Sequence, residues 1–213
     1  MNRTMTREQM LQTAAEKAFE NSRDLLEDSK ILFKKKKYAR AFALSVTAAE
    51  EYAKSFEFKC ELARFNIPGV PSESAHSFRQ ARFALLVITP YMMGVGGWNF
   101  FAQLAGVQPK KPDREFLELF IKTFNHNIQG RRNRALYVDL NGKLTAPSDE
   151  ITKKEAKHVM RIMDDVLKNE PEFLRVSGDD LQRTLGMGFL PLTNMSQSEL
   201  FARIGKMYLK KGT

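Results

Sequence analysis

Apolar and small residues recur every three or four positions in the first part of the chain, which is the spacing of an α-helix. One such stretch begins at a capping box formed by Thr6 and Gln9 and ends at four lysines, residues 34–37. A second follows at once and ends at 66–74, which contains two prolines and a glycine. The pattern predicts two long helices joined by a basic turn. The expected core positions are Met10, Ala14, Ala18, Leu25, Ser29 and Leu32 in the first helix, and Tyr38, Ala41, Phe42, Ser45, Ala48, Ala49, Tyr52 and Phe56 in the second.

The next region, 83–109, contains no charged residue. About 20 apolar residues are enough to cross a bilayer, so a membrane span is one interpretation of this region. Pro90 and the glycines of 94–97 interrupt it, however, and a lipid-facing helix has to satisfy all of its backbone groups internally. We therefore favour two buried segments, 83–93 and 98–107, on either side of a turn.

Helical spacing returns after "KKPD", 110–113, and leads into the arginine-rich sequence "GRRNRALYVDL", 130–140. Gly130 weakens this helix just before the arginines. Asn141 and Gly142 then form a pair that is typical of a tight hairpin turn. The expected core positions of the helix are Phe116, Leu119, Phe120, Thr123, Phe124 and Ile128.

Two more capping boxes, Thr152 with Glu155 and Ser196 with Glu199, predict further helices in the last third of the chain. The intervening sequence contains two prolines and three glycines, which is typical of a linker with a short helix. We therefore predict an all-α helical bundle with a short hairpin or loop after the arginine-rich helix. The predicted domains are the bundle, 1–168, and a linker with a C-terminal helical extension packed on it, 169–213.

Charge and cysteine content restrict the class of protein. Lys and Arg number 34 against 25 for Asp and Glu, and the net charge of +9 favours nucleic acid, an anionic membrane or an acidic protein as partner. Cys60 is the only cysteine and the histidines are three, which excludes a disulfide framework or thiolate zinc cluster, so we expect no metal and no other cofactor. The N-terminal sequence lacks the apolar core of a signal peptide, so we expect a cytoplasmic protein.

Three motifs occur in a characteristic order. The stretch Lys37–Phe56 has a basic and aromatic start and a run of small residues, and "HSFRQARF" and "ALYVDLNGKLTAP" follow it. In this order they resemble the AbiV family of abortive infection proteins, which belongs to the HEPN superfamily of helical domains in bacterial and archaeal defence. The resemblance covers roughly half of the chain and implies a HEPN-like bundle. The family's Glu-Glu-x-x-Lys motif is present as Glu50, Glu51 and Lys54.

The resemblance gives the arginine-rich sequence a meaning. Active HEPN ribonucleases carry an arginine, a polar residue, three to five further residues and then a histidine. Arg132 and Asn133 match the first two, and Tyr137 stands where the histidine would be. The resemblance implies metal-independent RNA cleavage, in which the arginine stabilises the extra charge on the phosphate and the histidine transfers protons. The tyrosine leaves open whether this protein is an enzyme.

The chemistry of tyrosine limits such a reaction. A histidine with a pKa near 6.5 suits acid–base catalysis at neutral pH, whereas a free tyrosine with a pKa near 10 is ionised in about one molecule per thousand. On a regular helix, moreover, a five-residue offset turns a side chain about 140° away, so Arg132 and Tyr137 converge only if the helix ends between them. The alternative is a basic helix end with a core tyrosine. We expect Arg132 to be an exposed side chain.

Five further residues are candidates for supporting roles. Glu50, Glu51 and Lys54 form either an ordinary ion pair on their helix or a group that orients the arginines across the bundle. His76 and Arg79 share a helix face and lie either beside the same site or on the surface.

Other residues complete the set of candidates. His126 precedes Arg132 by six positions and is an alternative source of the missing histidine, and Asp139 is expected to cap the loop after the arginines. The residues expected to contact nucleic acid or a protein partner are Arg131, Arg134, Lys35 and Lys36.

Two functions from different classes fit these observations. The first is an abortive-infection effector that acts on RNA or translation, as a metal-independent endoribonuclease with Tyr137 in place of the histidine. The second is a non-catalytic interaction module whose basic face binds a phage protein, a ribosome or a nucleic acid. The expected partners are a second copy of the chain in a homodimer, RNA or a ribosome, and a phage-encoded activator protein. A membrane is not an expected partner.

Overall fold

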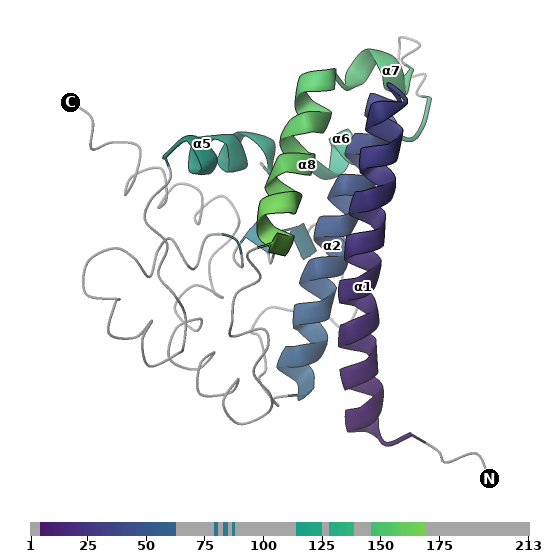
Figure 1. Cartoon of the computed structure of the whole chain (residues 1–213), viewed down its shortest axis with the longest axis vertical. Coiled ribbons are helices and arrows are strands. Elements are labelled where there is room, and N and C mark those ends of the chain that lie inside the picture. Colours follow the sequence, from purple (N-terminus) through teal and green to yellow (C-terminus); the bar gives the residue numbers. More distant parts are fainter. Residues whose placement is uncertain are drawn as a thin grey trace.

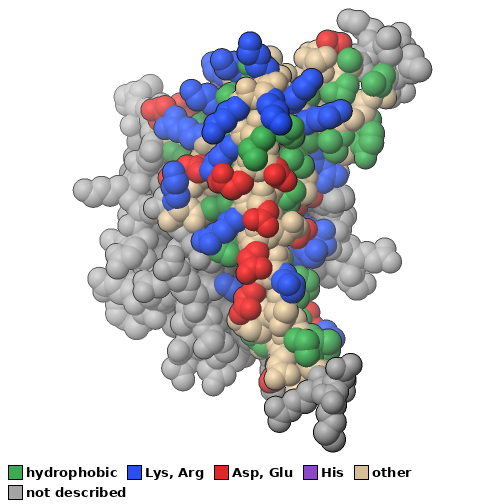
Figure 2. All heavy atoms as spheres, turned by 45° about the vertical axis from the view of Figure 1, so that its right-hand side comes forward, with side chains coloured by type: hydrophobic (Ala, Val, Ile, Leu, Met, Phe, Trp, Pro, Cys, Tyr) green, Lys and Arg blue, Asp and Glu red, His purple; other side chains and the backbone are tan. Residues whose placement is uncertain are grey.

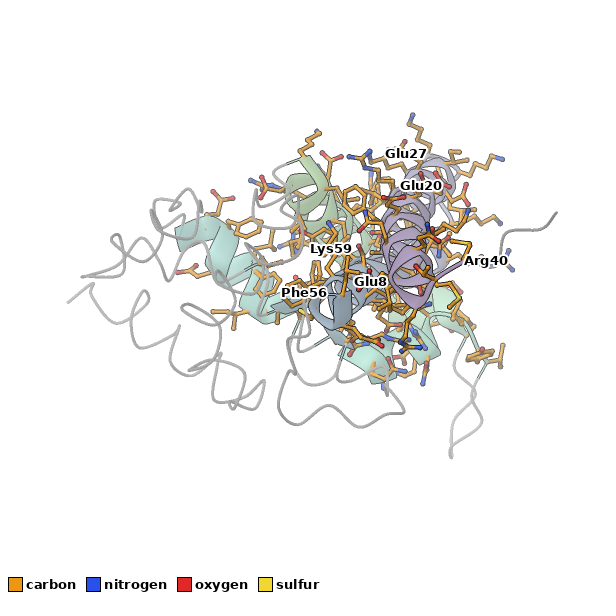
Figure 3. All side chains as sticks on the ribbon, turned by 90° about the horizontal axis from the view of Figure 1, so that it is seen from below. Glu8, Glu20, Glu27, Arg40, Phe56 and Lys59 are labelled. Carbon is orange, nitrogen blue, oxygen red and sulfur yellow. The ribbon has the colours of Figure 1, made fainter. Side chains whose placement is uncertain are left out.

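A computed structural model of the chain describes residues 5–62, 79–80, 83–84, 87, 114–124, 128–138 and 146–168. Every regular element in these residues is an α-helix, which confirms the predicted all-α fold. The two longest helices form an antiparallel pair, and a third packs beside the second of them (Figures 1 and 3). The helices are α1 (Arg7–Lys34), α2 (Tyr38–Leu62), α5 (Arg114–Thr123), α6 (Ile128–Arg134), α7 (Pro147–Glu150) and α8 (Lys153–Lys168).

Both ends of α1 are closed by hydrogen bonds. At its start, the Gln9 amide donates to the Thr6 hydroxyl at 3.2 Å and the Thr6 amide donates to the Gln9 side chain at 3.0 Å, which confirms the predicted capping box. At its end, the Lys36 and Lys37 amides each donate at 2.9 Å to carbonyls of the last turn. This end is a Schellman motif, in which the residue after the cap adopts a left-handed conformation. That residue is Lys36, with φ 59°.

Lys36→Gly is expected to stabilise the protein by about 0.5–1 kcal/mol. A Cβ atom makes the left-handed conformation unfavourable, and glycine avoids this cost while losing some backbone entropy on folding. For a chain of this size the gain corresponds to a rise of roughly 1–4 °C in melting temperature, measurable by calorimetry. Lys36→Ala separates the loss of charge from the backbone effect and should give no comparable gain. Lys35→Gly, at a residue with φ −78°, should lower the melting temperature. A rise in that control would contradict the explanation.

Small residues allow α1 and α2 to pack closely. The Ser22 hydroxyl donates to the Ala48 carbonyl at 2.7 Å, and the Ser29 hydroxyl donates to the Ala41 carbonyl at the same distance. Ser29 and Ser45 are also 2.7 Å apart, oxygen to oxygen. All three serines are buried, and these bonds satisfy their hydroxyls within the core. The predicted buried stripe of α2 is confirmed, with Tyr38 at its edge only partly buried.

The predicted stripe of α1 is partly wrong. Met10 is half exposed, at 50%, and Ala14, Leu25 and Leu32 are only partly buried. The reason is that small size rather than apolarity decides which face of α1 meets the closely packed α2. The buried positions of α1 are Ala15, Ala18, Ser22, Leu26 and Ser29.

Aromatic rings fill the core between α2 and α5. The rings of Tyr52 and Phe83 meet edge to face with centroids 6.0 Å apart. Phe83 in turn lies 4.8 Å from Phe124, which stacks on Phe120 at 5.2 Å. Phe83, Ala84 and Val87 are buried, as predicted for the start of the uncharged region. This cluster fixes Phe120 of α5, and Phe124 just after its last residue, against α2.

The helix expected to run from the "KKPD" sequence into the arginines is two helices. α5 ends at Thr123 and α6 starts at Ile128, with Asn125 and Asn127 in the interval. Asparagine side chains compete for backbone hydrogen bonds and favour helix ends, a signal stronger than Gly130, which lies inside α6. The sequence analysis also missed the short helix α7.

The helix predicted from the second capping box, Thr152 with Glu155, is confirmed as α8. The Glu155 amide donates to the Thr152 hydroxyl at 3.3 Å, and the Thr152 amide donates to the Glu155 carboxylate at 2.8 Å. Further along, Lys30 of α1 lies 2.9 Å from Asp164 of α8, nitrogen to oxygen. α8 is therefore tied to α1 as well as packed against α2.

Several predicted features lie outside the described residues: the turn at 94–97, the hairpin at Asn141 and Gly142, the capping box at Ser196 and Glu199, and the extension 169–213. No helix in the described part of the chain is long and apolar enough to cross a membrane.

Candidate functional site

The arginine-rich sequence forms α6, which is anchored at both ends. Ile128 at its start and Ala135 just after its last residue are fully buried. The amides of Leu136 and Tyr137 both donate to the Asn133 carbonyl at 3.0 Å, so the chain turns away after Arg134. The helix thus ends between Arg132 and Tyr137, as their convergence requires.

Arg132 faces the interior and meets a buried carboxylate. Its Nη1 lies 2.8 Å from Oε2 of Glu50 on α2, and the two side chains are 12% and 3% exposed. The expectation that Arg132 is exposed is therefore wrong. A buried carboxylate is costly unless it is paired and hydrogen-bonded, and Arg132 provides that pairing.

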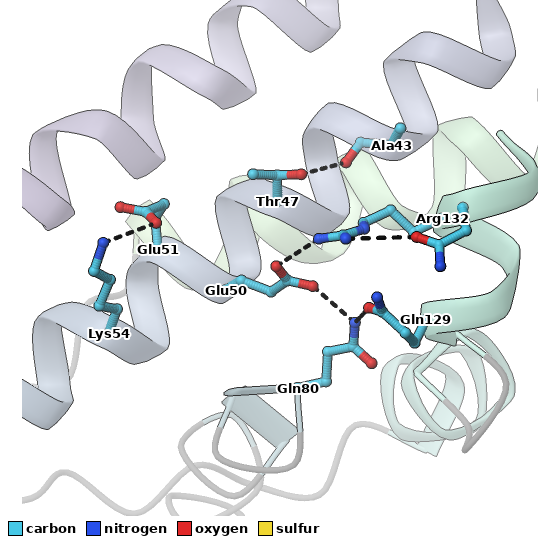
Figure 4. Close-up of polar contacts among 9 residues, drawn as sticks. Ala43, Thr47, Glu50, Glu51, Lys54, Gln80, Gln129 and Arg132 are labelled. Atoms are coloured by element: carbon cyan, nitrogen blue, oxygen red, sulfur yellow. Dashed lines mark hydrogen bonds and ion pairs between the residues drawn. The ribbon is translucent and has the colours of Figure 1, made fainter. Parts of the chain in front are cut away.

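Gln80 also bonds Glu50, and Gln129 bonds Gln80 in turn (Figure 4). Its second oxygen, Oε1, accepts a hydrogen bond at 2.8 Å from Nε2 of Gln80. The same nitrogen lies 2.7 Å from Oε1 of Gln129, one turn before Arg132 on α6. We call these four residues, Glu50, Gln80, Gln129 and Arg132, the Glu50 network. Both carboxylate oxygens are engaged, and α6 is held at two points of the same face.

Neither glutamine was among the residues predicted for the site. Gln129 carried a signal, since it lies three positions before Arg132 and so shares its helix face. Gln80 carried none, because nothing in its local sequence indicates that it reaches Glu50 across the bundle. The residue singled out in that segment was Arg79, whose Nε lies 4.0 Å from Oε2 of Glu57.

The other two arginines of α6 also meet glutamates. Arg131 forms an ion pair with Glu155 of α8, and its guanidinium carbon lies 5.5 Å from the ring centroid of Phe42. Nε of Arg134 lies 3.1 Å from Oε2 of Glu150 on α7. Three arginines within four positions thus bind carboxylates from α2, α7 and α8. These three ion pairs hold α6 in place.

The Glu155 contacts give a pH prediction. Burial raises the pKa of Glu155, but the hydrogen bonds from Thr152 and Arg131 outweigh burial and hold the pKa below its usual value of 4.5. A lowered pKa stabilises the fold above the unfolded value, and this contribution disappears as pH falls through the folded value. Glu155→Gln should therefore melt below the parent at pH 7, and the gap should narrow as the pH falls from 7 to 3. An equal gap at both pH values in thermal melts would contradict this.

Asn133 and Tyr137 both lie on the surface. Asn133 is exposed, and its Oδ1 is 3.5 Å from Nη2 of Arg132, a long contact. Tyr137 is 67% exposed, so the alternative of a core tyrosine is wrong. The guanidinium of Arg132 is therefore held by Glu50 on one side and adjoins an exposed amide on the other. An anion at Asn133 would lie within reach of Nη2.

The remaining candidates make other contacts or lie outside the described residues. Lys54 pairs with Glu51 on α2 at 3.4 Å, nitrogen to oxygen, so these two form the ordinary ion pair while Glu50 reaches the arginine. Lys35 and Lys36 are exposed at the turn between α1 and α2. His76, His126 and Asp139 lie outside the described residues.

Comparison with known proteins identifies the family of the chain. The AbiV family model, which describes a HEPN domain, matches residues 10–168, a range that includes the whole Glu50 network. No curated protein and no solved structure matches the chain. The extent of the family match, together with the all-α fold, shows that the chain belongs to the AbiV family of HEPN proteins, whose role is abortive infection.

Proposed function

We propose that this AbiV-family protein acts on RNA as a metal-independent ribonuclease, with Arg132 binding the scissile phosphate. The observation that carries the proposal is the fixed position of Arg132, which Glu50 holds from the interior while its Nη2 adjoins exposed Asn133. A guanidinium that is already oriented loses little further entropy when it binds an anion. Such an arginine fits a phosphate that gains negative charge in the transition state.

The proposed reaction needs no group beyond the RNA and the protein. The ribose 2′-hydroxyl attacks the adjacent phosphorus and gives its proton to water. The bond from phosphorus to the 5′ oxygen breaks, and that oxygen takes up a proton. Tyr137 is the proposed donor, since it stands where the superfamily's histidine would be and its exposed phenol carries an O–H group. The products are a 2′,3′-cyclic phosphate and a 5′-hydroxyl. Arg132 stabilises the extra charge on the phosphate oxygens.

The test is RNA cleavage in excess chelator. The purified protein is incubated with total RNA, and Arg132→Lys is compared with Arg134→Lys as a matched control. Lysine keeps a positive charge opposite Glu50 but loses the planar fork, so we expect cleavage to fall about 10²–10³-fold in Arg132→Lys only. Cleavage that chelator abolishes, or that Arg132→Lys leaves unchanged, would contradict the proposal.

A second function has its own support. Tyr137 replaces the expected histidine, and every arginine of α6 is bound to a glutamate. Both facts favour a non-catalytic module whose basic face binds a phage protein or a ribosome. In that case defence activity survives Arg132→Lys, and no cleavage of RNA accompanies it.

We further propose that the protein is a homodimer in the cytoplasm, where RNA and ribosomes are found. Leu136 and Val138 are exposed apolar side chains on either side of Tyr137 in the sequence, and an isologous contact would cover these two on both copies. We expect light scattering at micromolar concentration to give twice the mass of the chain. A monomeric mass would contradict this prediction, and so would recovery only in detergent.

A further inference from the structure

The turn between α1 and α2 carries an unusual concentration of positive charge. Lys34, Lys35, Lys36, Lys37 and Arg40 are all exposed, and we call them the basic turn. Figure 2 shows lysine and arginine side chains gathered at this end of the molecule. None of the five forms an ion pair with any other residue that the structure describes, in contrast to the arginines of α6.

The basic turn also carries two local costs. Lys36 adopts φ 59° at a position that favours glycine, and four adjacent lysines repel one another. A residue held in an unfavourable conformation points to a role that the fold alone does not require. Binding of an anionic partner would offset the repulsion and would account for lysine at position 36.

The surroundings of the basic turn indicate which polyanion fits. The rings of Phe33 and Tyr38 pack edge to face at 5.2 Å, and Ala39 is buried, so these side chains are engaged within the fold. Exposed Ile31, one turn earlier, offers far less apolar area than a membrane-surface helix or the anchor of a protein interface requires. A sugar-phosphate backbone needs cations alone.

We propose that the basic turn binds the phosphate backbone of single-stranded RNA, without base specificity, as a second contact beside Arg132. The inference rests on the proposed function and adds to it the surface that holds the substrate. Arg132 meets α2 at Glu50, which is 13 residues beyond Lys37 and roughly 20 Å along the helix axis. A strand of about six nucleotides, at about 3.4 Å each, would reach from one contact to the other.

The experiment measures binding to RNA that cannot be cleaved. A fluorescent 2′-O-methyl RNA 20-mer lacks the attacking hydroxyl, so its affinity is measured independently of catalysis, by anisotropy between 50 and 200 mM salt (roughly the range over which counterion release dominates). We expect Lys35→Gln/Lys37→Gln to weaken binding and to reduce the slope of log Kd against log salt by about 1.4, or roughly 0.7 for each lost phosphate contact. Lys36→Gly should reduce it by about 0.7 while raising the melting temperature.

The matched control is Lys17→Gln/Arg23→Gln, which removes the same two charges from exposed positions of α1. These residues lie roughly 27 and 18 Å along the helix from Lys35 and should leave the slope unchanged. Equal loss of slope in both double variants would overturn the proposal, because net charge alone would then explain binding. RNA binding that does not change with salt would also overturn it. So would a result in which the basic turn is needed to bind anionic vesicles or polyglutamate but not to bind RNA.

Failure of the basic turn and failure of the ribonuclease are distinguishable. If Lys35→Gln/Lys37→Gln still cleaves RNA and shows an unchanged salt slope, the proposed role of the basic turn is wrong and the proposed ribonuclease activity stands. A reduced slope in that variant, with no cleavage by the parent, supports the basic turn and overturns the ribonuclease.

Discussion

Arg132→Met is expected to lower the free energy of unfolding by about 3–5 kcal/mol, because it leaves the buried carboxylate of Glu50 without its counter-ion. Loss of one partner of a buried pair is far more destabilising than loss of both. Urea denaturation measures the effect. Arg134→Met is the control, since Arg134 pairs with Glu150 at a more exposed position and should cost about 1 kcal/mol or less.

A double-mutant cycle with Glu50→Gln tests whether the loss comes from this ion pair. A glutamine keeps an oxygen that accepts from Gln80 but carries no charge, so the double variant Arg132→Met/Glu50→Gln should recover about 2 kcal/mol or more of the loss. Additive effects of the two substitutions would contradict the pairing. If the double variant recovers stability in this way, loss of RNA cleavage in Arg132→Met reports on folding as well as on chemistry. Arg132→Lys is then the better functional test.

Tyr137→His is expected to raise chelator-resistant RNA cleavage by about 10- to 100-fold at neutral pH. A positioned group that transfers a proton contributes about 10²–10⁴-fold, and imidazole titrates near that pH while phenol does not. The exposed position of Tyr137 accepts the ring without disturbing the core. The measurement is the initial cleavage rate of a defined RNA between pH 5 and 9, where the variant should show a new dependence near pH 6.5.

Tyr137→Phe is the matched control because it removes one oxygen and keeps the ring. Its melting temperature should equal that of the parent, since an exposed hydroxyl stabilises little. Loss of cleavage in this variant assigns a direct role to the hydroxyl. Full activity in Tyr137→Phe, together with no gain in Tyr137→His, would remove Tyr137 from the site and favour the interaction module.

Local signals in the sequence were enough to predict the main helices. The capping boxes at Thr6 and Thr152 mark the starts of α1 and α8, because each provides side-chain partners for amides that a helix cannot satisfy itself. The four lysines mark the turn between α1 and α2 for a different reason, because four adjacent charges cannot all be buried in a core. These signals act within a few residues, and a sequence displays them directly.

The site could be predicted only in part, because its contacts span the bundle. Glu50 was identified as a candidate partner of the arginines, yet neither its own neighbours nor those of Arg132 indicate that both are buried. Gln80 lies 30 positions from Glu50, with no local pattern to connect them. Burial and pairing of polar groups depend on which helix faces meet, and in α1 even that face followed side-chain size rather than apolarity.

The distance along the chain between Glu50 and Arg132 has a consequence for biosynthesis. The two residues are 82 positions apart. At elongation rates of about 5–20 residues per second, a ribosome adds Arg132 roughly 4–16 s after Glu50. A nascent chain that ends before α6 lacks Arg132 and therefore its ion pair with Glu50. If the proposed function is correct, a product that ends before α6 therefore lacks the phosphate-binding arginine and cannot cleave RNA.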